Sequence, residues 1–172
     1  MTVAVDVRDL LGNAGSHRAV RVAEAVPGLS TDLARVPEDR PVEADLVMES
    51  VVEGILASGP VKATVALTCA RCLKAFEAGF RVEVQELFAP GARPEDDAYP
   101  VEEGFVDLEP LIRDNVLPAM PFAPLCKPDC LGLCARCGGD RNLGECTCSD
   151  EQDPRWSALS ALSGLVLPER EE

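Results

Sequence analysis

The stretch CKPDCLGLCARCGGDRNLGECTC, from Cys126 to Cys148, holds six of the eight cysteines of this 172-residue chain. The other two lie upstream in LTCARCLKAF. All eight fall into close pairs with CxxC, CxxxC, CxxC and CxC spacing: Cys69 with Cys72, Cys126 with Cys130, Cys134 with Cys137, and Cys146 with Cys148. Cysteines that merely fill a hydrophobic core have no reason to occur in pairs. The pairing therefore points to a chemical function of the thiols.

Disulfide bonds and metal coordination both bring cysteines together. Disulfide frameworks are typical of short chains in oxidising compartments. This chain is not short, and its N-terminal MTVAVDVRDLL carries charges where an export signal would be apolar, which predicts a cytosolic protein. Zinc is bound by four thiolates in a tetrahedron, and cysteines two to four residues apart supply two ligands from one turn. The spacing therefore predicts two zinc ions, with four cysteine ligands each.

Sequence distance suggests how the ligands divide between the two ions. Cys134, Cys137, Cys146 and Cys148 are close enough to form one site, and two glycines after Cys137 let the backbone turn near sulfur. The remaining four cysteines would join a hairpin tip to a segment that follows a helix. Because Cys130 is near Cys134 in sequence, an exchange of ligands between the sites stays open.

The charge of the chain is strongly negative but unevenly spread. A formal net charge of -14 disfavours non-specific binding to nucleic acid or to a membrane surface. Several basic residues nevertheless lie within or beside the cysteine motifs: Arg71, Lys74, Lys127, Arg136 and Arg141. These cations would offset the negative charge of four-thiolate sites. Alternatively, they form a small basic face for phosphate.

Hydrophobic patterning predicts an α+β fold, with a mainly antiparallel β-sheet, one or two packed helices and a C-terminal cysteine-rich zinc knuckle or ribbon. Period-two alternation from Val42 to Phe88 indicates strands, with a turn at Gly59 and Pro60 and with CARC at the next turn. TVAVDV and RAVRVAEAV are further candidate strands near the start. Residues 89–104 combine proline, glycine and acids, which is typical of a mobile loop.

A helix is predicted over about residues 107–120, with Asp107 as its N-cap. A second amphipathic helix is predicted within DPRWSALSALSGL, where it would pack on the protein or bind a partner. The expected organisation is an antiparallel β domain over residues 1–125, a zinc-binding cysteine cluster over 126–150 and a helical tail over 151–172.

Catalysis is not expected from this sequence. His17 is the only histidine, and its neighbours in SHRAV offer no partner for acid–base chemistry. The chain has no dinucleotide fingerprint and no Walker loop. A site closed by four cysteines leaves no open position on zinc for a substrate. No stretch is long and apolar enough to span a bilayer.

Three stretches carry a resemblance to a known family: LTCARCLKAF (67–76), VDLEPLIRDNVLPAMP (106–121) and PLCKPDCLGLCARCGGDRNLGECTC (124–148). With strands, CxxC, helix and cysteine cluster in this order, the chain resembles the YceD family. The resemblance implies a role in accumulation of the large-subunit ribosomal RNA, with genes often beside one for a zinc-bearing ribosomal protein. It implies no known reaction and no mapped RNA site.

The leading hypothesis is a non-enzymatic assembly factor whose zinc-stapled surface binds a ribosomal protein or a pre-large-subunit particle. The acidity of the chain favours a protein contact over direct contact with RNA. The runner-up is a redox-switched zinc chaperone or thiol sensor, because zinc-bound thiolates can be oxidised with release of the metal. A DNA-binding zinc ribbon is a third hypothesis, which the charge disfavours.

Overall fold

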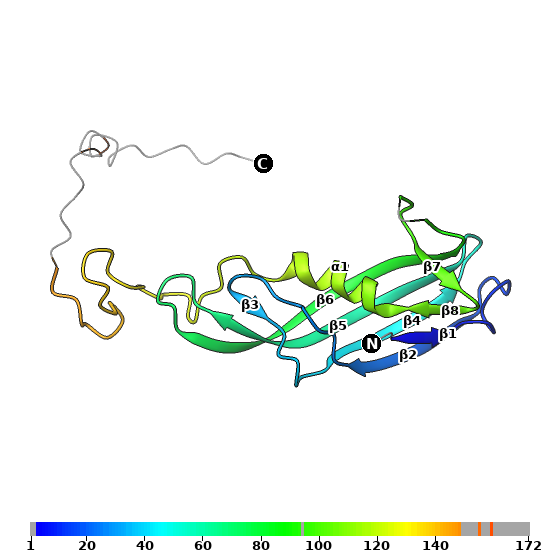
Figure 1. The fold of residues 1–172 in the computed structure, drawn as a ribbon, viewed down its shortest axis with the longest axis horizontal. Coiled ribbons are helices and arrows are strands. Elements are labelled where there is room, and N and C mark those ends of the chain that lie inside the picture. The colour runs from blue at the N-terminus through cyan, green and yellow to red at the C-terminus, as the bar shows by residue number, and fades with distance from the viewer. Residues whose placement is uncertain (1–2, 94, 149–154, 156–158, 160–172) are drawn as a thin grey trace, which may run out of the picture. The chain divides into compact units, whose positions relative to one another are not determined.

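The computed structural model describes residues 3–93, 95–148, 155 and 159 (Figure 1). Contacts divide the chain into two compact units, Met1–Gly132 and Leu133–Glu172. The predicted helix in the C-terminal tail lies almost entirely outside the described residues. Within the described residues, no helix has the length and apolar character that crossing a membrane requires.

The first unit is built on one sheet of eight strands in the order β1-β8-β7-β6-β5-β4-β2, with β3 pairing with β5 off this path. Its strands are β1 (Ala4–Asp6), β2 (His17–Glu24), β3 (Ala34–Arg35), β4 (Val42–Ser50), β5 (Ile55–Thr68), β6 (Ala75–Pro90), β7 (Tyr99–Glu102) and β8 (Phe105–Asp107). The described strands pair antiparallel, apart from β7, which runs parallel to β6. With one helix added, the unit has the predicted mixture of sheet and helix.

The β5–β6 hairpin is the longest element of the sheet and carries the CARC sequence at its tip. Its ladder runs from Ile55 opposite Phe88 to Thr68 opposite Ala75. Side chains of β5 alternate between buried and half-buried positions, as the sequence pattern predicted. One face of the hairpin therefore joins the core, and the loop after Thr68 projects Cys69 and Cys72 from its end.

The turn predicted at Gly59 and Pro60 is wrong, because both residues lie inside β5. The chain reverses earlier, where the N–H of Val51 donates to the carbonyl of Gly54 at 2.9 Å. Proline has no N–H to give to a ladder, so it normally marks the end of a central strand. Here the β4–β5 pairing is interrupted between the pairs Ala44–Val61 and Val47–Ser58, and the strand continues.

Residues 89–104, expected to form a mobile loop, contain the end of β6 and all of β7. The rings of Phe88 and Tyr99 pack with their centroids 5.3 Å apart. The Tyr99 hydroxyl donates a hydrogen bond to Asp114 Oδ2 at 3.0 Å. The loop prediction was wrong here. Tyr99 and Val101 pack against the core, but the prolines and acids around them give the stretch the composition of a loop.

Helix α1 (Leu108–Ala119) begins and ends close to the predicted limits. Asp107 is the N-cap, and its Oδ1 accepts the N–H of Glu109 at 3.0 Å. The apolar stripe of the helix packs against the core through buried side chains: Leu108, Leu111, Ile112 and Val116. Figure 1 shows α1 lying along the sheet, where it contacts β6. The chain leaving α1 then runs toward the tip of the β5–β6 hairpin.

Substitution at Gly59 tests whether the interrupted pairing depends on this residue. Gly59 has a φ of 144°, and a Cβ there would overlap the carbonyl oxygen of Asp45. We expect Gly59→Ala to lower the free energy of unfolding by about 1–3 kcal/mol. Gly79 lies on β6 with open space around it, so Gly79→Ala is the matched control and should stabilise the strand by about 0.5–1 kcal/mol. Urea unfolding of both variants measures the difference in their free energies of unfolding. Equal unfolding midpoints for the two variants would contradict the requirement for glycine at residue 59.

Candidate metal centres

The eight cysteines form two groups of four, one in each unit. Cys69, Cys72, Cys126 and Cys130 make the first group. The second group consists of Cys134, Cys137, Cys146 and Cys148. Within each group the sulfur atoms all lie within 4.8 Å of one another. The structure thus divides the cysteines in the way that their sequence spacing suggested.

The sulfur positions of the first group fit one tetrahedral ion. The Sγ atoms of Cys69 and Cys130 are 3.8 Å apart, and those of Cys72 and Cys126 are 3.6 Å apart. A tetrahedron with bonds of about 2.3 Å to zinc has edges of about 3.8 Å. A disulfide would instead need sulfurs about 2.05 Å apart. The distances therefore match four thiolates around a metal and exclude disulfides in this arrangement.

The first group joins two segments that are far apart in the chain. Cys69 and Cys72 come from the β5–β6 loop, whereas Cys126 and Cys130 follow α1. The sulfur contacts span 54 and 61 residues of sequence. The backbone supports the same junction, because the N–H of Ala70 donates to the carbonyl of Pro124 at 2.8 Å.

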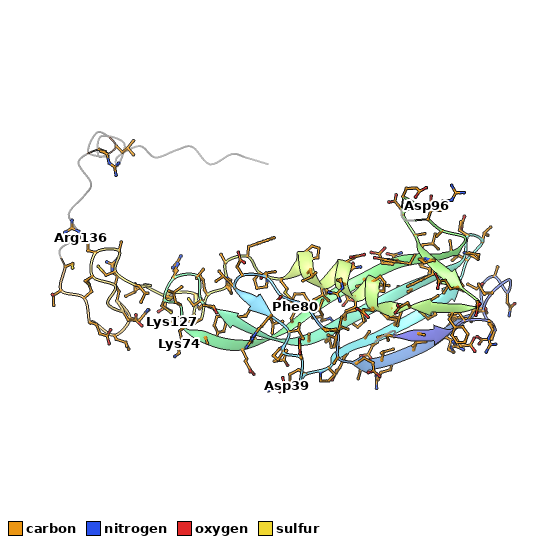
Figure 2. The ribbon with its side chains drawn as sticks, in the orientation of Figure 1. Asp39, Lys74, Phe80, Asp96, Lys127 and Arg136 are labelled. Carbon is orange, nitrogen blue, oxygen red and sulfur yellow. The ribbon has the colours of Figure 1, made fainter. Side chains whose placement is uncertain are left out.

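Arg71 reinforces this junction between the β5–β6 loop and the segment after α1. Its Nη1 donates to the carbonyl of Cys130 at 2.8 Å. Gly132 packs so closely against Arg71 that a Cβ would lie 3.0 Å from the Arg71 carbonyl oxygen. Of the predicted cations, Arg71 therefore has a positioning role in the first group. Figure 2 shows Lys74 and Lys127 at the same end of the first unit, where the Nζ of Lys127 is 3.7 Å from Asp129.

Both CxxC sequences fold into the same hydrogen-bonded loop. The N–H of Cys69 donates to the carbonyl of Lys74 at 2.9 Å, and the N–H of Leu73 returns to the carbonyl of Cys69 at 2.9 Å. The second group repeats these two bonds, both at 2.9 Å: Cys134 N–H to Gly139 carbonyl, and Gly138 N–H to Cys134 carbonyl. A turn of this kind directs two thiols to one side, as a shared metal ion requires.

The residue after the second cysteine is left-handed in both loops. Its φ is 73° at Gly138 and 60° at Leu73. Glycine adopts this conformation without steric cost, whereas a leucine there is strained. Sequence reasoning anticipated the glycine near sulfur but missed Leu73, whose strain has no signal in composition or periodicity.

The turn also lowers the pKa of the first cysteine of each CxxC. Backbone N–H groups, chiefly that of Cys72, lower the pKa of Cys69 to about 6. In the second group the N–H of Cys137 and then that of Arg136, whose nitrogen is 3.4 Å from the sulfur, lower the pKa of Cys134 to about 6. In each group the backbone thus favours the thiolate form of the first CxxC cysteine.

The thiols whose pKa is raised need a cation to ionise beside these thiolates. Burial raises the pKa of Cys126 to about 12. Hydrogen bonding with the Cys137 thiol raises the pKa of Cys148 to about 12. A metal ion bound by thiolates supplies the missing positive charge and releases protons when it binds. The donor set of soft sulfur atoms fits zinc better than magnesium or calcium.

His17 lies at the first position of β2 with its side chain exposed, where its strand partner is Glu49. It belongs to neither cysteine group. His17 is therefore a surface residue of β2, as its sequence context predicted.

Metal analysis of serine variants tests the two groups separately. We expect two zinc ions per chain, with Cys69→Ser and Cys134→Ser each losing one, as measured by inductively coupled plasma mass spectrometry. Thr147→Ser is the matched control within the CTC sequence and should keep both ions. Only Cys69→Ser should lower the unfolding midpoint of the first unit, because its group alone joins parts of that unit. Loss of both ions from either variant would contradict two independent sites.

Comparison with known proteins identifies the family. The sequence profile described as large ribosomal RNA subunit accumulation protein YceD matches residues 57–163. An uncharacterized protein of Mycobacterium leprae (strain TN) is 34% identical over 162 residues, which cover 89% of this chain and 75% of that protein. Uncharacterized proteins of Mycobacterium bovis and Mycobacterium tuberculosis are 34% identical over 142 residues, 79% of this chain and 69% of theirs. No solved structure matches significantly. The chain therefore belongs to the YceD family.

Proposed function

We propose that this protein is a non-enzymatic factor in the accumulation of large-subunit ribosomal RNA, acting by binding a ribosomal protein or a pre-large-subunit particle. The family description supports the ribosomal role. The observation that carries the binding role is the junction at the first cysteine group, which fixes two distant segments into one surface.

We propose that each cysteine group binds one zinc ion through its four sulfurs. The ion would supply a structural cross-link, because four thiolates close its coordination shell and leave no position for a substrate. A zinc-thiolate protein of this kind suits a reducing compartment such as the cytoplasm, where thiols stay reduced. These properties support a binding function over a catalytic one.

Three large apolar side chains near the first group are exposed to solvent. Leu73 is 61% exposed, Phe122 83% and Leu131 63%. Each lies within two residues of a contact that joins the β5–β6 loop to the segment after α1. Large apolar side chains that gather at the surface are typical of protein interfaces. We call these three residues the hairpin-tip surface.

Strain at Leu73 supports a role for this surface. The left-handed backbone of Leu73 costs about 1–2 kcal/mol relative to a relaxed residue. The equivalent position in the second group is Gly138, which avoids that cost. An exposed, strained leucine contributes little to stability, so its side chain is best explained by a contact with a partner.

Charge favours a basic protein as that partner. The net charge of -14 attracts cationic proteins over long range and repels the phosphates of RNA. Around the hairpin-tip surface, Arg71, Lys74 and Lys127 offset the charge of the thiolates. The apolar contact is thus locally close to neutral, while the rest of the chain steers a basic ribosomal protein toward it.

Co-sedimentation tests the proposed function directly. Tagged protein should migrate with pre-large-subunit particles in a sucrose gradient, and its depletion should lower large-subunit ribosomal RNA. Phe122→Ser should reduce the particle-bound fraction about tenfold, the effect of losing roughly 1.4 kcal/mol. Val52→Ser, at a residue that is 91% exposed in the β4–β5 turn, is the matched control and should bind normally. Normal ribosomal RNA after depletion, with no particle association, would refute the proposal.

Replacement of Leu73 by glycine separates stability from binding. Leu73→Gly relieves the left-handed strain, so the midpoint of urea unfolding should rise or stay unchanged. The same variant lacks the exposed side chain and should bind particles more weakly than the wild type. A variant that is less stable, or that binds as well as the wild type, would argue against the role assigned to Leu73.

A further inference from the structure

The two cysteine groups differ in their exposure to solvent. In the first group Cys69 is 0% exposed, Cys130 1% and Cys72 9%, and Cys126 is half-buried. In the second group Cys137 and Cys148 are exposed, and the other two cysteines are half-buried. A reagent in solution therefore reaches sulfur directly in the second group and is largely excluded from the first.

The groups also differ in the protein structure that supports them in addition to any metal ion. The first group lies in a unit whose core contains a large set of buried side chains from the sheet and α1. In the second unit, no residue of the described stretch 133–148 is buried. Within this described stretch, the backbone contacts are local turns and a bridge between Leu133 and Asp140. A metal ion in the second group would therefore be the main support for the fold of residues 133–148, as in small zinc modules.

We propose that the second cysteine group is a site of reversible oxidation, at which peroxide converts Cys137 and Cys148 into a disulfide and releases the metal, while the first group keeps its ion. This inference rests on the zinc occupancy proposed above and is independent of the ribosomal partner. Cys137 and Cys148 are the exposed members of the group, and their sulfurs lie within 4.8 Å.

Oxidation of the two thiolates to a disulfide removes two electrons, which hydrogen peroxide accepts. The Cys137 thiolate attacks one peroxide oxygen, the O–O bond breaks, and a sulfenic acid and hydroxide form. The Cys148 thiolate then attacks that sulfur, the S–O bond breaks, and a second hydroxide leaves as the disulfide forms. Two protons convert the hydroxides to water. The ion loses two of its four ligands and dissociates.

Because no residue of the described stretch 133–148 is buried, this stretch can accommodate the new bond. The two sulfurs must approach to about 2.05 Å, which requires a local backbone movement that no packed side chain of 133–148 opposes. In the first group, the same movement would disturb the Arg71–Cys130 hydrogen bond and the Ala70–Pro124 contact. Oxidation would therefore loosen the second unit and leave the hairpin-tip surface intact.

Treatment of the zinc-loaded full-length chain with hydrogen peroxide tests the proposal. A chromogenic chelator should report release of one of the two ions, with a parallel loss of two free thiols. Tryptic mapping should join the peptide 137–141 to the peptide 142–155. Cys146→Ser then distinguishes Cys148 from Cys146 as the partner, since the crosslink should persist in this variant. A reductant with added zinc should restore the starting state.

A second measurement avoids variants that fail to fold. Limited alkylation of the zinc-loaded wild type should modify Cys137 and Cys148 before Cys69 and Cys130. Parallel release of both ions, earlier modification of the first group, or metal that stays bound under peroxide would each overturn the proposal. A chain that binds no zinc at all would instead contradict the proposed occupancy, so the two failures are distinguishable.

Discussion

The junction of the β5–β6 loop with the segment after α1 is the constraint on which the account of the first unit depends. Sulfur contacts of 3.6 and 3.8 Å bridge 54 and 61 residues of sequence. Structural zinc contributes apparent free energies of about 10–16 kcal/mol in small finger peptides, far more than one hydrogen bond. Metal binding at this point would fix Leu73, Phe122 and Leu131 as one surface.

The two cysteine groups contain the same type of CxxC loop but differ in how deeply they are buried. The CxxC loops share their hydrogen bonds and the left-handed residue that follows the second cysteine. Burial in the first unit makes its group suited to a permanent cross-link, whereas exposure in the second unit makes its group suited to chemistry with solvent. The first loop has the strained Leu73 at the position where the second loop has Gly138, which is why we propose the first loop as the one that contacts a partner.

Spacing and periodicity predicted most of this arrangement. Cysteine pairs in sequence indicated both groups, alternation indicated the β5–β6 hairpin, and Asp107 indicated the start of α1. The secondary-structure predictions were wrong where tertiary packing overrode the usual preference of proline and acidic residues for turns and loops. Pro60 lies within a central strand because the ladder is interrupted beside it, and Tyr99 packs on Phe88 within a stretch that looks like a loop. Exposure of Phe122 depends on tertiary contacts that local sequence does not encode.

Hydrogen–deuterium exchange of the zinc-loaded and chelator-treated protein tests the central claim most directly. Removal of zinc should raise exchange in two separated segments of the first unit, 69–74 and 124–132, and throughout 133–148. The paired interiors of β4, β5 and β6 should keep their protection, because the apolar core holds them. Identical exchange with and without metal, or a chain that never retains zinc, would contradict the claim that metal joins the hairpin tip to the segment after α1.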